Sequence, residues 1–233
     1  MSDLLTRKPV TALGQPSLSC NSKAAAVAIL KTSPTLDANT KWTLTPYLVD
    51  GIISAEAKRI GRWERRGETY LWMEWDWLRQ IAGGVGPGQL YPAAYNDVVL
   101  NLKTELKQFL VHMGVNCGAG LRRGCGEIPL TLKGYPGDVM DPVTADFFIA
   151  GYLALRIKQA LKPGRIADDQ LQFGIGFYFG ARNTIAKAQN AISPADKGAS
   201  VLRYPPVRDY LLRSSDPRER DVAAYIQEVF GRR

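Results

Sequence analysis

The fold is decided by residues 141–161, which read DPVTADFFIAGYLALRIKQAL. Asp141 before Pro142 is a typical helix start, because the carboxylate caps free backbone N–H groups and the proline ring suits the first turn. The residues that follow are apolar nearly all round, and Pro163-Gly164 ends the pattern. Since a helix without a polar face is buried on every side, we predict a mainly α-helical domain around one buried central helix.

Shorter helical patterns lie on both sides of this stretch. Their expected starts are Thr45 before Pro46, Asp97, Asp168, the region of Arg182, and Ser215 or Asp216 before Pro217. The helix from Asp97 should run to Met113, and His112 near its end should interact with the helix dipole. Residues 114–140 are rich in glycine and proline, which predicts loops with a short hairpin. We expect residues 1–40 to form a partly ordered arm with one short helix, and residues 41–233 to form the domain.

The composition limits the kinds of partner that the protein can have. Of its 233 residues, 45% are hydrophobic, so a sizeable core can be buried. Lys and Arg outnumber Asp and Glu by 30 to 22, and the net charge of +8 favours an anionic partner. Because the basic residues are scattered, we expect no nucleic-acid binding. We also expect no membrane span, since no apolar run approaches roughly 18 residues, and no secretory signal in residues 1–9.

Three cysteines and one histidine are the candidates for disulfides or metal ligands. Cys117 and Cys125 bracket a glycine-rich stretch and could close a small disulfide loop, which would leave Cys20 unpaired. Two free thiols fit the sequence equally well. Because no second Cys or His pair stands nearby, we expect neither a metal site nor a cofactor.

Glu56 is the most informative single residue of the chain. Apolar residues between positions 48 and 53 form one stripe of the helix that begins after Thr45, and Glu56 continues this stripe. A carboxyl group at the end of an apolar face loses hydration, which disfavours its charged form and raises its pKa. Such an acid can stay protonated near neutral pH and donate its proton to a leaving group. The alternative is that Glu56 turns to solvent or pairs with Lys58 or Arg59.

Three separated segments resemble one family of proteins. Residues 51–56, GIISAE, look like the helix end that carries the catalytic glutamate in goose-type lysozymes and the related soluble lytic transglycosylases. Residues 86–92, GPGQLYP, resemble the second motif, a Gly-x-x-Gln turn that a proline follows in the transglycosylases. Residues 168–180, DDQLQFGIGFYFG, look like the third, an acidic-Gln-Leu start, a small-residue helix and then Ala-Tyr-Asn-Ala-Gly. The helix of residues 141–161 stands where the family has its central helix.

The resemblance implies a lysozyme-like fold over roughly residues 45–190, with a small loop or hairpin insertion. It implies peptidoglycan as substrate and cleavage of the β-1,4 bond between N-acetylmuramic acid and N-acetylglucosamine. Glu56 would protonate the glycosidic oxygen, and Tyr178 would contact the substrate and help to hold Glu56. The sugar groove would be formed by four residues of the turn, since small residues let a polysaccharide approach the main chain: Gly86, Gly88, Gln89 and Tyr91.

The chain departs from the family pattern in ways that bear on mechanism. The Trp-rich stretch before the turn looks like an insertion, Phe179 replaces the family's Asn, and Tyr91 replaces an aspartate of the goose-type enzymes. An inverting hydrolase needs a second carboxylate, whereas a lytic transglycosylase needs only one. The candidates are Glu64, Glu68, Glu74, Asp76 and Asp97. We prefer Asp76, because it lies in the segment before the glycine-rich turn; its alternative role is a surface ion pair with Arg79.

We therefore expect a muramidase that is made in the cytoplasm and acts on the cell wall. The expected lack of a secretory signal fits an antibacterial effector that type VI secretion delivers to the periplasm of a rival cell. The producer would then make an immunity protein that blocks the groove. A phage endolysin fits the same observations. The alternatives are a lytic transglycosylase with Glu56 as sole acid and base, or a non-catalytic lysozyme-like module that binds glycan or a protein.

Overall fold

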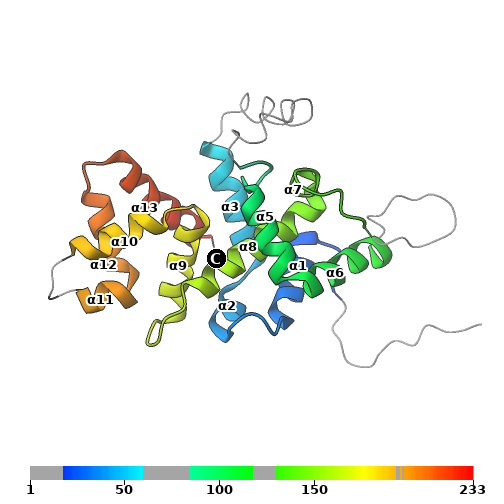
Figure 1. Ribbon diagram of the computed structural model, residues 1–233, viewed down its shortest axis with the longest axis horizontal. Coiled ribbons are helices and arrows are strands. Elements are labelled where there is room, and N and C mark those ends of the chain that lie inside the picture. The colour runs from blue at the N-terminus through cyan, green and yellow to red at the C-terminus, as the bar shows by residue number, and fades with distance from the viewer. Residues whose placement is uncertain (1–17, 60–83, 118–129, 193–194, 196, 233) are drawn as a thin grey trace, which may run out of the picture.

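Helix α8, Pro142–Gln159, is the central element of the molecule (Figure 1). Asp141 caps it, with one carboxylate oxygen that accepts hydrogen bonds from the backbone N–H groups of Val143 and Thr144. Side chains on its several faces, such as Phe147, Phe148 and Ile157, are fully buried, so the predicted buried central helix is confirmed. The computed structural model describes residues 18–59, 84–117, 130–192, 195 and 197–232.

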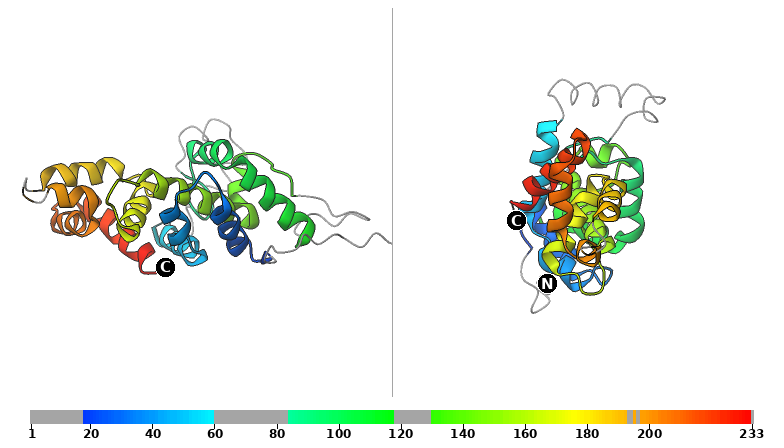
Figure 2. Two further views of the ribbon diagram at one scale, coloured as in Figure 1. Left: turned by 90° about the horizontal axis from the view of Figure 1, so that it is seen from below. Right: turned by 90° about the vertical axis from the view of Figure 1, so that its left-hand side faces the viewer.

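Two groups of helices lie on either side of α8 (Figures 1 and 2). One group consists of α1 (Ser22–Thr32), α5 (Pro92–Asn101), α6 (Lys103–Val111) and α7 (Gly137–Met140). The other consists of α9 (Ala167–Tyr178), α10 (Arg182–Ala191), α11 (Lys197–Leu202), α12 (Tyr204–Arg213) and α13 (Pro217–Phe230). In this second group α9 packs on α8, and the helices that follow pack on α9 and on one another. Helices α2 (Ala38–Thr43) and α3 (Pro46–Arg59) contact members of both groups.

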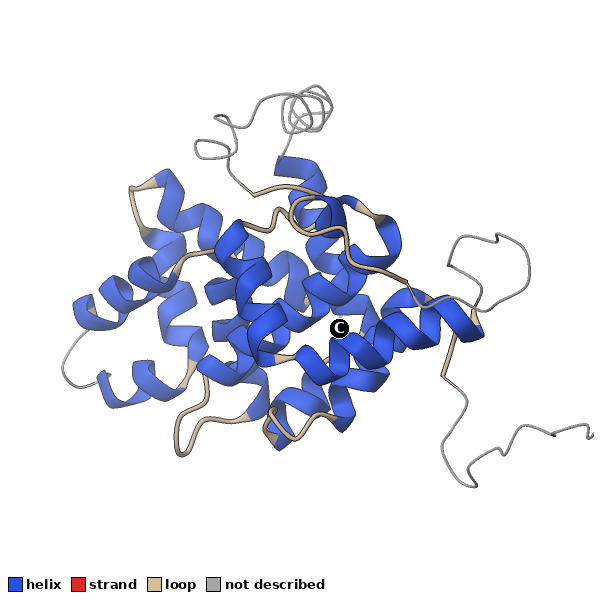
Figure 3. Ribbon diagram, turned by 45° about the vertical axis from the view of Figure 1, so that its right-hand side comes forward, coloured by secondary structure: helices blue, strands red, loops and turns tan. Residues whose placement is uncertain are grey.

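The protein is a mainly α-helical single domain. Figure 3 shows helices joined by loops, and the described residues form twelve α-helices, one π-helical turn and no sheet. An isolated antiparallel bridge joins Val85 to Leu90. The hairpin predicted within residues 114–140 falls partly outside the described residues, and residues 130–140 contain α7 and no strand. No helix in the described part of the chain is long and apolar enough to cross a membrane.

Helix α9 crosses α8 at close range, and this contact orients the third sequence motif. A Cβ at Gly174 would lie 2.6 Å from the Cα of Ile157, a distance that forces the two backbones apart, so the crossing requires glycine. One turn earlier, the fully buried Gln170 donates a hydrogen bond of 3.0 Å from Nε2 to the carbonyl oxygen of Ile157. The amide thus satisfies a backbone group inside the core, where an unpaired carbonyl would be costly.

Helix α1 is the short helix expected within residues 1–40. Asn21 caps it by accepting a hydrogen bond from the N–H of Ala24. The helix packs on α8, where Ser22 Oγ donates to Asp146 Oδ2 at 2.5 Å, and burial raises the pKa of the Asp146 carboxyl. The residues of α1 that face α8 therefore belong to the same core as the central helix.

The helix predicted to start at Asp97 starts earlier. Pro92 occupies the first turn of α5, with Tyr91 as the N-cap residue, so Asp97 lies inside this helix. Proline in the first turn has the φ of a helical residue and no N–H group to leave unpaired. Pro92, and not Asp97, therefore determines where α5 begins. Leu102 leaves helical geometry and α6 begins after it, so the single predicted helix is two.

The cysteine pairing differs from the predicted one. Cys117 forms a disulfide with Cys20, 97 residues earlier, and not with Cys125, which lies outside the described residues. The residues before α1 and the π-helical turn after α6, His112–Asn116, lie together, and local spacing could not reveal this. His112 is buried there, and its Nε2 donates to the carbonyl oxygen of Ser19 at 2.9 Å, so it has a tertiary partner beyond the helix dipole.

Loss of the disulfide should lower stability by an amount that reflects the long loop that it closes. Cys20→Ser and Cys117→Ser should each lower the free energy of unfolding by roughly 2–4 kcal/mol, because the unfolded chain gains conformational freedom. Urea unfolding without reductant measures this, and the difference from wild type should vanish in excess reductant. Cys125→Ser is the matched control; an equal loss in that variant would contradict the pairing.

Candidate functional site

Glu56 lies in the last turn of α3 and is buried, with 7% of its surface exposed. The predicted continuation of the apolar stripe is therefore confirmed, and Glu56 does not turn to solvent. The Tyr225 hydroxyl of α13 donates a hydrogen bond of 2.8 Å to Glu56 Oε1. Lys58 and Arg59 both reach Glu228 of α13, with N–O distances of 2.5 and 3.5 Å. The carboxyl group of Glu56 is thus enclosed where α3 packs against α13.

The glycine-rich segment forms a tight turn closed by two backbone hydrogen bonds of 3.0 Å between Val85 and Leu90. Gly86 has a φ of +76°, and a Cβ there would lie 2.1 Å from the carbonyl oxygen of Val139. A Cβ at Gly88 would lie 2.4 Å from Ile149 Cγ1 of α8. Both glycines are therefore required for the turn to pack on the core. Their predicted contact with a sugar chain remains a prediction.

Gln89 and Tyr91 follow the two glycines. Gln89 has a φ of +49°, which is uncommon for a residue other than glycine, and its Nε2 donates to the carbonyl oxygen of Gly86 at 3.0 Å. Tyr91 is 57% exposed at the N-terminus of α5. The Gln89 side chain therefore folds back onto the turn, whereas Tyr91 is exposed and the glycines pack on the core.

Tyr178, the last residue of α9, joins the third motif to this turn. Its hydroxyl donates a hydrogen bond of 2.8 Å to the carbonyl oxygen of Gly88, and its ring packs edge-on against Tyr152 at 5.2 Å between ring centroids. Burial raises the pKa of Tyr178 well above its usual value, and the nearby charge of Glu56 raises it further. The hydroxyl that donates to Glu56 is that of Tyr225, whereas the prediction gave the holding role to Tyr178.

These residues meet in the wall of one cavity of about 750 Å³. Four predicted site residues line it, namely Glu56, Gln89, Tyr91 and Tyr178. The other lining residues are Arg59, Leu90, Ala94, Tyr152, Phe179, Gly180 and Asp221. The three motifs, which lie between residues 51 and 180 of the chain, therefore line one cavity, to which α8 and α13 also contribute.

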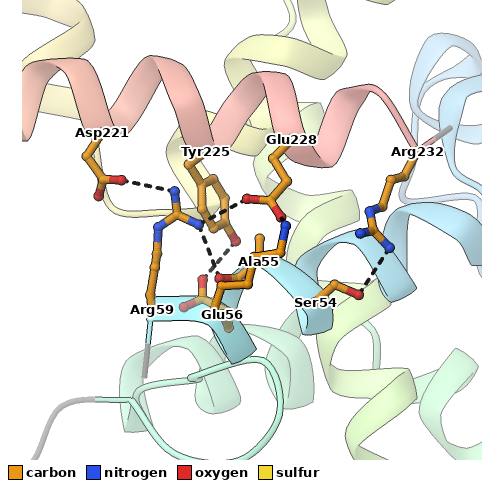
Figure 4. A network of polar contacts seen from close by, with 9 residues as sticks. Ser54, Ala55, Glu56, Arg59, Asp221, Tyr225, Glu228 and Arg232 are labelled. Atoms are coloured by element: carbon orange, nitrogen blue, oxygen red, sulfur yellow. Dashed lines mark hydrogen bonds and ion pairs between the residues drawn. The ribbon is translucent and has the colours of Figure 1, made fainter. Parts of the chain in front are cut away.

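Arg59 and Tyr225 join α13 to the end of α3 (Figure 4), and the ring of Phe179 stacks on that of Tyr225. The rings of Phe179 and Tyr225 stack with centroids 4.2 Å apart, and the guanidinium of Arg59 lies 4.7 Å from the Tyr225 centroid. Arg59 also donates to the carbonyl oxygen of Ala55 at 3.1 Å and to Asp221 Oδ1 at 3.0 Å. Burial, followed by the charge of Glu56, raises the pKa of Tyr225 well above its usual value.

The sequence did not reveal the contribution of α13. Tyr225 is one of several apolar residues on the predicted face of the terminal helix, and nothing local connects it to Glu56, 169 positions earlier. Phe179 is a departure from the family's Asn, and the structure gives it a defined place in the stack with Tyr225. Asp221 lies one helical turn before Tyr225 and lines the cavity.

The predicted second carboxylate, Asp76, lies outside the described residues, as do Glu64, Glu68 and Glu74. Asp97 is described, and it forms an ion pair with Arg156, whose guanidinium lies 4.4 Å from the Tyr152 ring centroid. Asp97 is not among the lining residues of the cavity.

In the part of the chain that the structure describes, Cys20, His112 and Cys117 form one group with metal-ligand atoms close together. The two sulfur atoms are bonded to each other, so they offer no thiolates in this state. None of the three lines the cavity of Glu56. Comparisons with protein-family models, with curated proteins and with solved structures find no match for this chain.

The hydrogen bond between Tyr225 and Glu56 should be measurable as a coupling in stability. Tyr225→Phe should lower the free energy of unfolding by roughly 1.5–3 kcal/mol, because a buried carboxyl loses a donor. In a Glu56→Ala background the same change should cost less than about 1 kcal/mol. A double-mutant cycle by denaturant unfolding gives the coupling energy.

Tyr178→Phe is the matched control for this cycle, since it removes a buried tyrosine hydroxyl that donates to Gly88. Its coupling to Glu56→Ala should be smaller than that of Tyr225→Phe, because the Tyr178 hydroxyl donates to a backbone carbonyl. A Tyr225 cycle that shows no coupling would mean that the contact contributes nothing to the folded state.

Proposed function

We propose that the protein is a glycosidase that cleaves peptidoglycan, a muramidase in which Glu56 is the general acid. One observation carries the proposal: a buried glutamate shares the wall of a cavity with the glycine-rich turn and with Tyr178. These are the three elements that resemblance to goose-type lysozymes and lytic transglycosylases assigns to one site. Their meeting around a buried central helix supports the resemblance from residues that lie far apart in the sequence.

The surroundings of Glu56 suit a proton donor. A carboxyl group withdrawn from water loses hydration of its charged form, which favours the protonated state that an acid must have before reaction. The Tyr225 hydroxyl donates to Oε1, which fixes the orientation of the carboxyl group in the cavity wall. Protonation of the glycosidic oxygen between N-acetylmuramic acid and N-acetylglucosamine would let that oxygen leave as a neutral hydroxyl.

The wall of the cavity also suits a carbohydrate polymer. Tyr91 offers an exposed ring for the apolar side of a pyranose, and Gln89 offers an amide close to the turn. The net charge of +8 favours approach to an anionic cell wall. Peptidoglycan is therefore the substrate class that we propose.

The proposed setting is the cell wall of a competing bacterium. There the enzyme would act as an antibacterial toxin delivered by type VI secretion, and a cognate immunity protein would cover the same cavity in the producer. Release of the enzyme as a phage endolysin would require the same chemistry. A lytic transglycosylase is a second candidate, because residues 86–92 follow the transglycosylase version of the turn, with proline at its end.

Glu56→Gln tests the central assignment. The amide cannot donate a proton as an acid, yet its oxygen can still accept the hydrogen bond of Tyr225, so the fold should be kept. We expect release of muropeptides from purified peptidoglycan to fall by roughly 100-fold or more, the usual contribution of a general acid. Mass spectrometry of the soluble products gives the rate, and circular dichroism checks the fold.

Near-normal turnover in the Glu56→Gln variant would remove Glu56 from the mechanism. No release by the wild-type protein would leave a glycan-binding module. The type of end formed distinguishes the two enzymes, since hydrolysis leaves a reducing end and transglycosylation leaves a 1,6-anhydro end.

A further inference from the structure

We propose that Asp221 of α13 is the second carboxylate of this site and the base that activates water, which makes the enzyme an inverting hydrolase. The inference rests on the proposed function, because it assigns a role in the same reaction. It replaces Asp76 in that role.

The position of Asp221 in the cavity is the first argument. Glu56 and Asp221 are the two carboxylates among the described residues that line the cavity. Asp221 and Tyr225 are four positions apart on α13, so they lie on one face, separated by roughly 6 Å along the helix axis. Since Tyr225 touches Glu56, Asp221 lies about one helical turn further along the cavity wall. The assignment requires the two carboxyl groups to stand about 6.5–9.5 Å apart, the spacing with which inverting glycosidases accommodate a water molecule.

The way in which Asp221 is held is the second argument. Arg59 Nη2 donates to Asp221 Oδ1 at 3.0 Å (Figure 4), and the Arg59 guanidinium itself lies over the rings of Tyr225 and Phe179. A guanidinium has only donors, so it orients the carboxylate without competing for a proton. The Asp221 side chain is 49% exposed, so solvent from the cavity can reach it. A base needs this combination of fixed orientation and access to water.

The two acids differ in surroundings as their roles require. Glu56 is enclosed by α3 and α13 and accepts a hydrogen bond from an uncharged hydroxyl. Asp221 is half exposed and paired with a cation. The buried acid is thus held against a hydroxyl donor, whereas the exposed carboxylate can meet water from the cavity.

The proposed reaction is a single displacement at C1 by a water molecule. Asp221 takes a proton from a water molecule, whose oxygen bonds to C1 of the N-acetylmuramic acid unit. The bond between C1 and the bridging oxygen breaks, and that oxygen takes the proton of Glu56 to become the 4-hydroxyl of N-acetylglucosamine. Asp221 ends protonated and Glu56 ionised, and exchange with solvent restores both.

Glu228 provides a matched control, because it is a second acidic partner of Arg59 on the same helix and is not among the lining residues of the cavity. Asp221→Asn and Glu228→Gln each remove one negative charge from Arg59. We expect Asp221→Asn to lower hydrolysis by roughly 100-fold or more, and Glu228→Gln to stay within about threefold of wild type. Both are assayed on purified peptidoglycan, with mass spectrometry of the muropeptides and thermal unfolding of each variant.

Chemical rescue separates a base from an ion-pair partner. Azide is an anion and needs no proton removed, so excess sodium azide should restore cleavage by Asp221→Asn and give muropeptides that end in a glycosyl azide. Azide should not restore Glu56→Gln to the same extent, because the leaving oxygen still needs a proton.

Three results would overturn the assignment of Asp221: near-normal hydrolysis by Asp221→Asn, a loss without an azide product, or an equal loss in Glu228→Gln. Formation of 1,6-anhydro ends by the wild-type enzyme would also overturn it while leaving peptidoglycan cleavage intact. Wild-type protein that releases nothing would instead reject the proposed function itself, and the assignment of Asp221 with it.

Discussion

The contact of α13 with the end of α3 is the constraint on which the site depends. Glu56 is withdrawn from water, and a buried carboxyl group requires a hydrogen-bond partner. Tyr225 supplies that partner from the opposite end of the chain, and the stack of Arg59, Tyr225 and Phe179 keeps the tyrosine in place. The C-terminal helix is therefore part of the candidate site as well as part of the fold.

Helix α8 supports the contact between α3 and α13 indirectly, because α9 and the glycine-rich turn both pack on it. Gly174 allows α9 to cross it closely, and Gly88 allows the turn to pack on Ile149. Tyr178 then joins α9 to the turn with a hydrogen bond to Gly88. A cavity between three separate motifs results from packing on one buried helix, which explains why glycines recur in the motifs.

The tyrosines of the candidate site differ in burial and in hydrogen bonding. Tyr178 and Tyr225 are buried, and each hydroxyl has a fixed acceptor, so their roles are to orient the turn and the acid. Tyr91 is exposed at the rim, where a ring can meet a sugar. In the mechanism that we propose, fixed groups surround the reacting bond and exposed groups bind the chain on either side of it.

The sequence by itself determined the elements whose causes are local. Capping residues and apolar periodicity predicted α3, α8 and α13, and periodicity predicted α9, which starts just before the expected Asp168. The stripe of α3 predicted the burial of Glu56, because such patterns depend on neighbours within a few positions. The tertiary structure decided what lies opposite each face. The Tyr225 partner of Glu56, the Cys20–Cys117 pair and the cavity-facing Asp221 all depend on how helices cross, and a one-dimensional pattern does not contain that information.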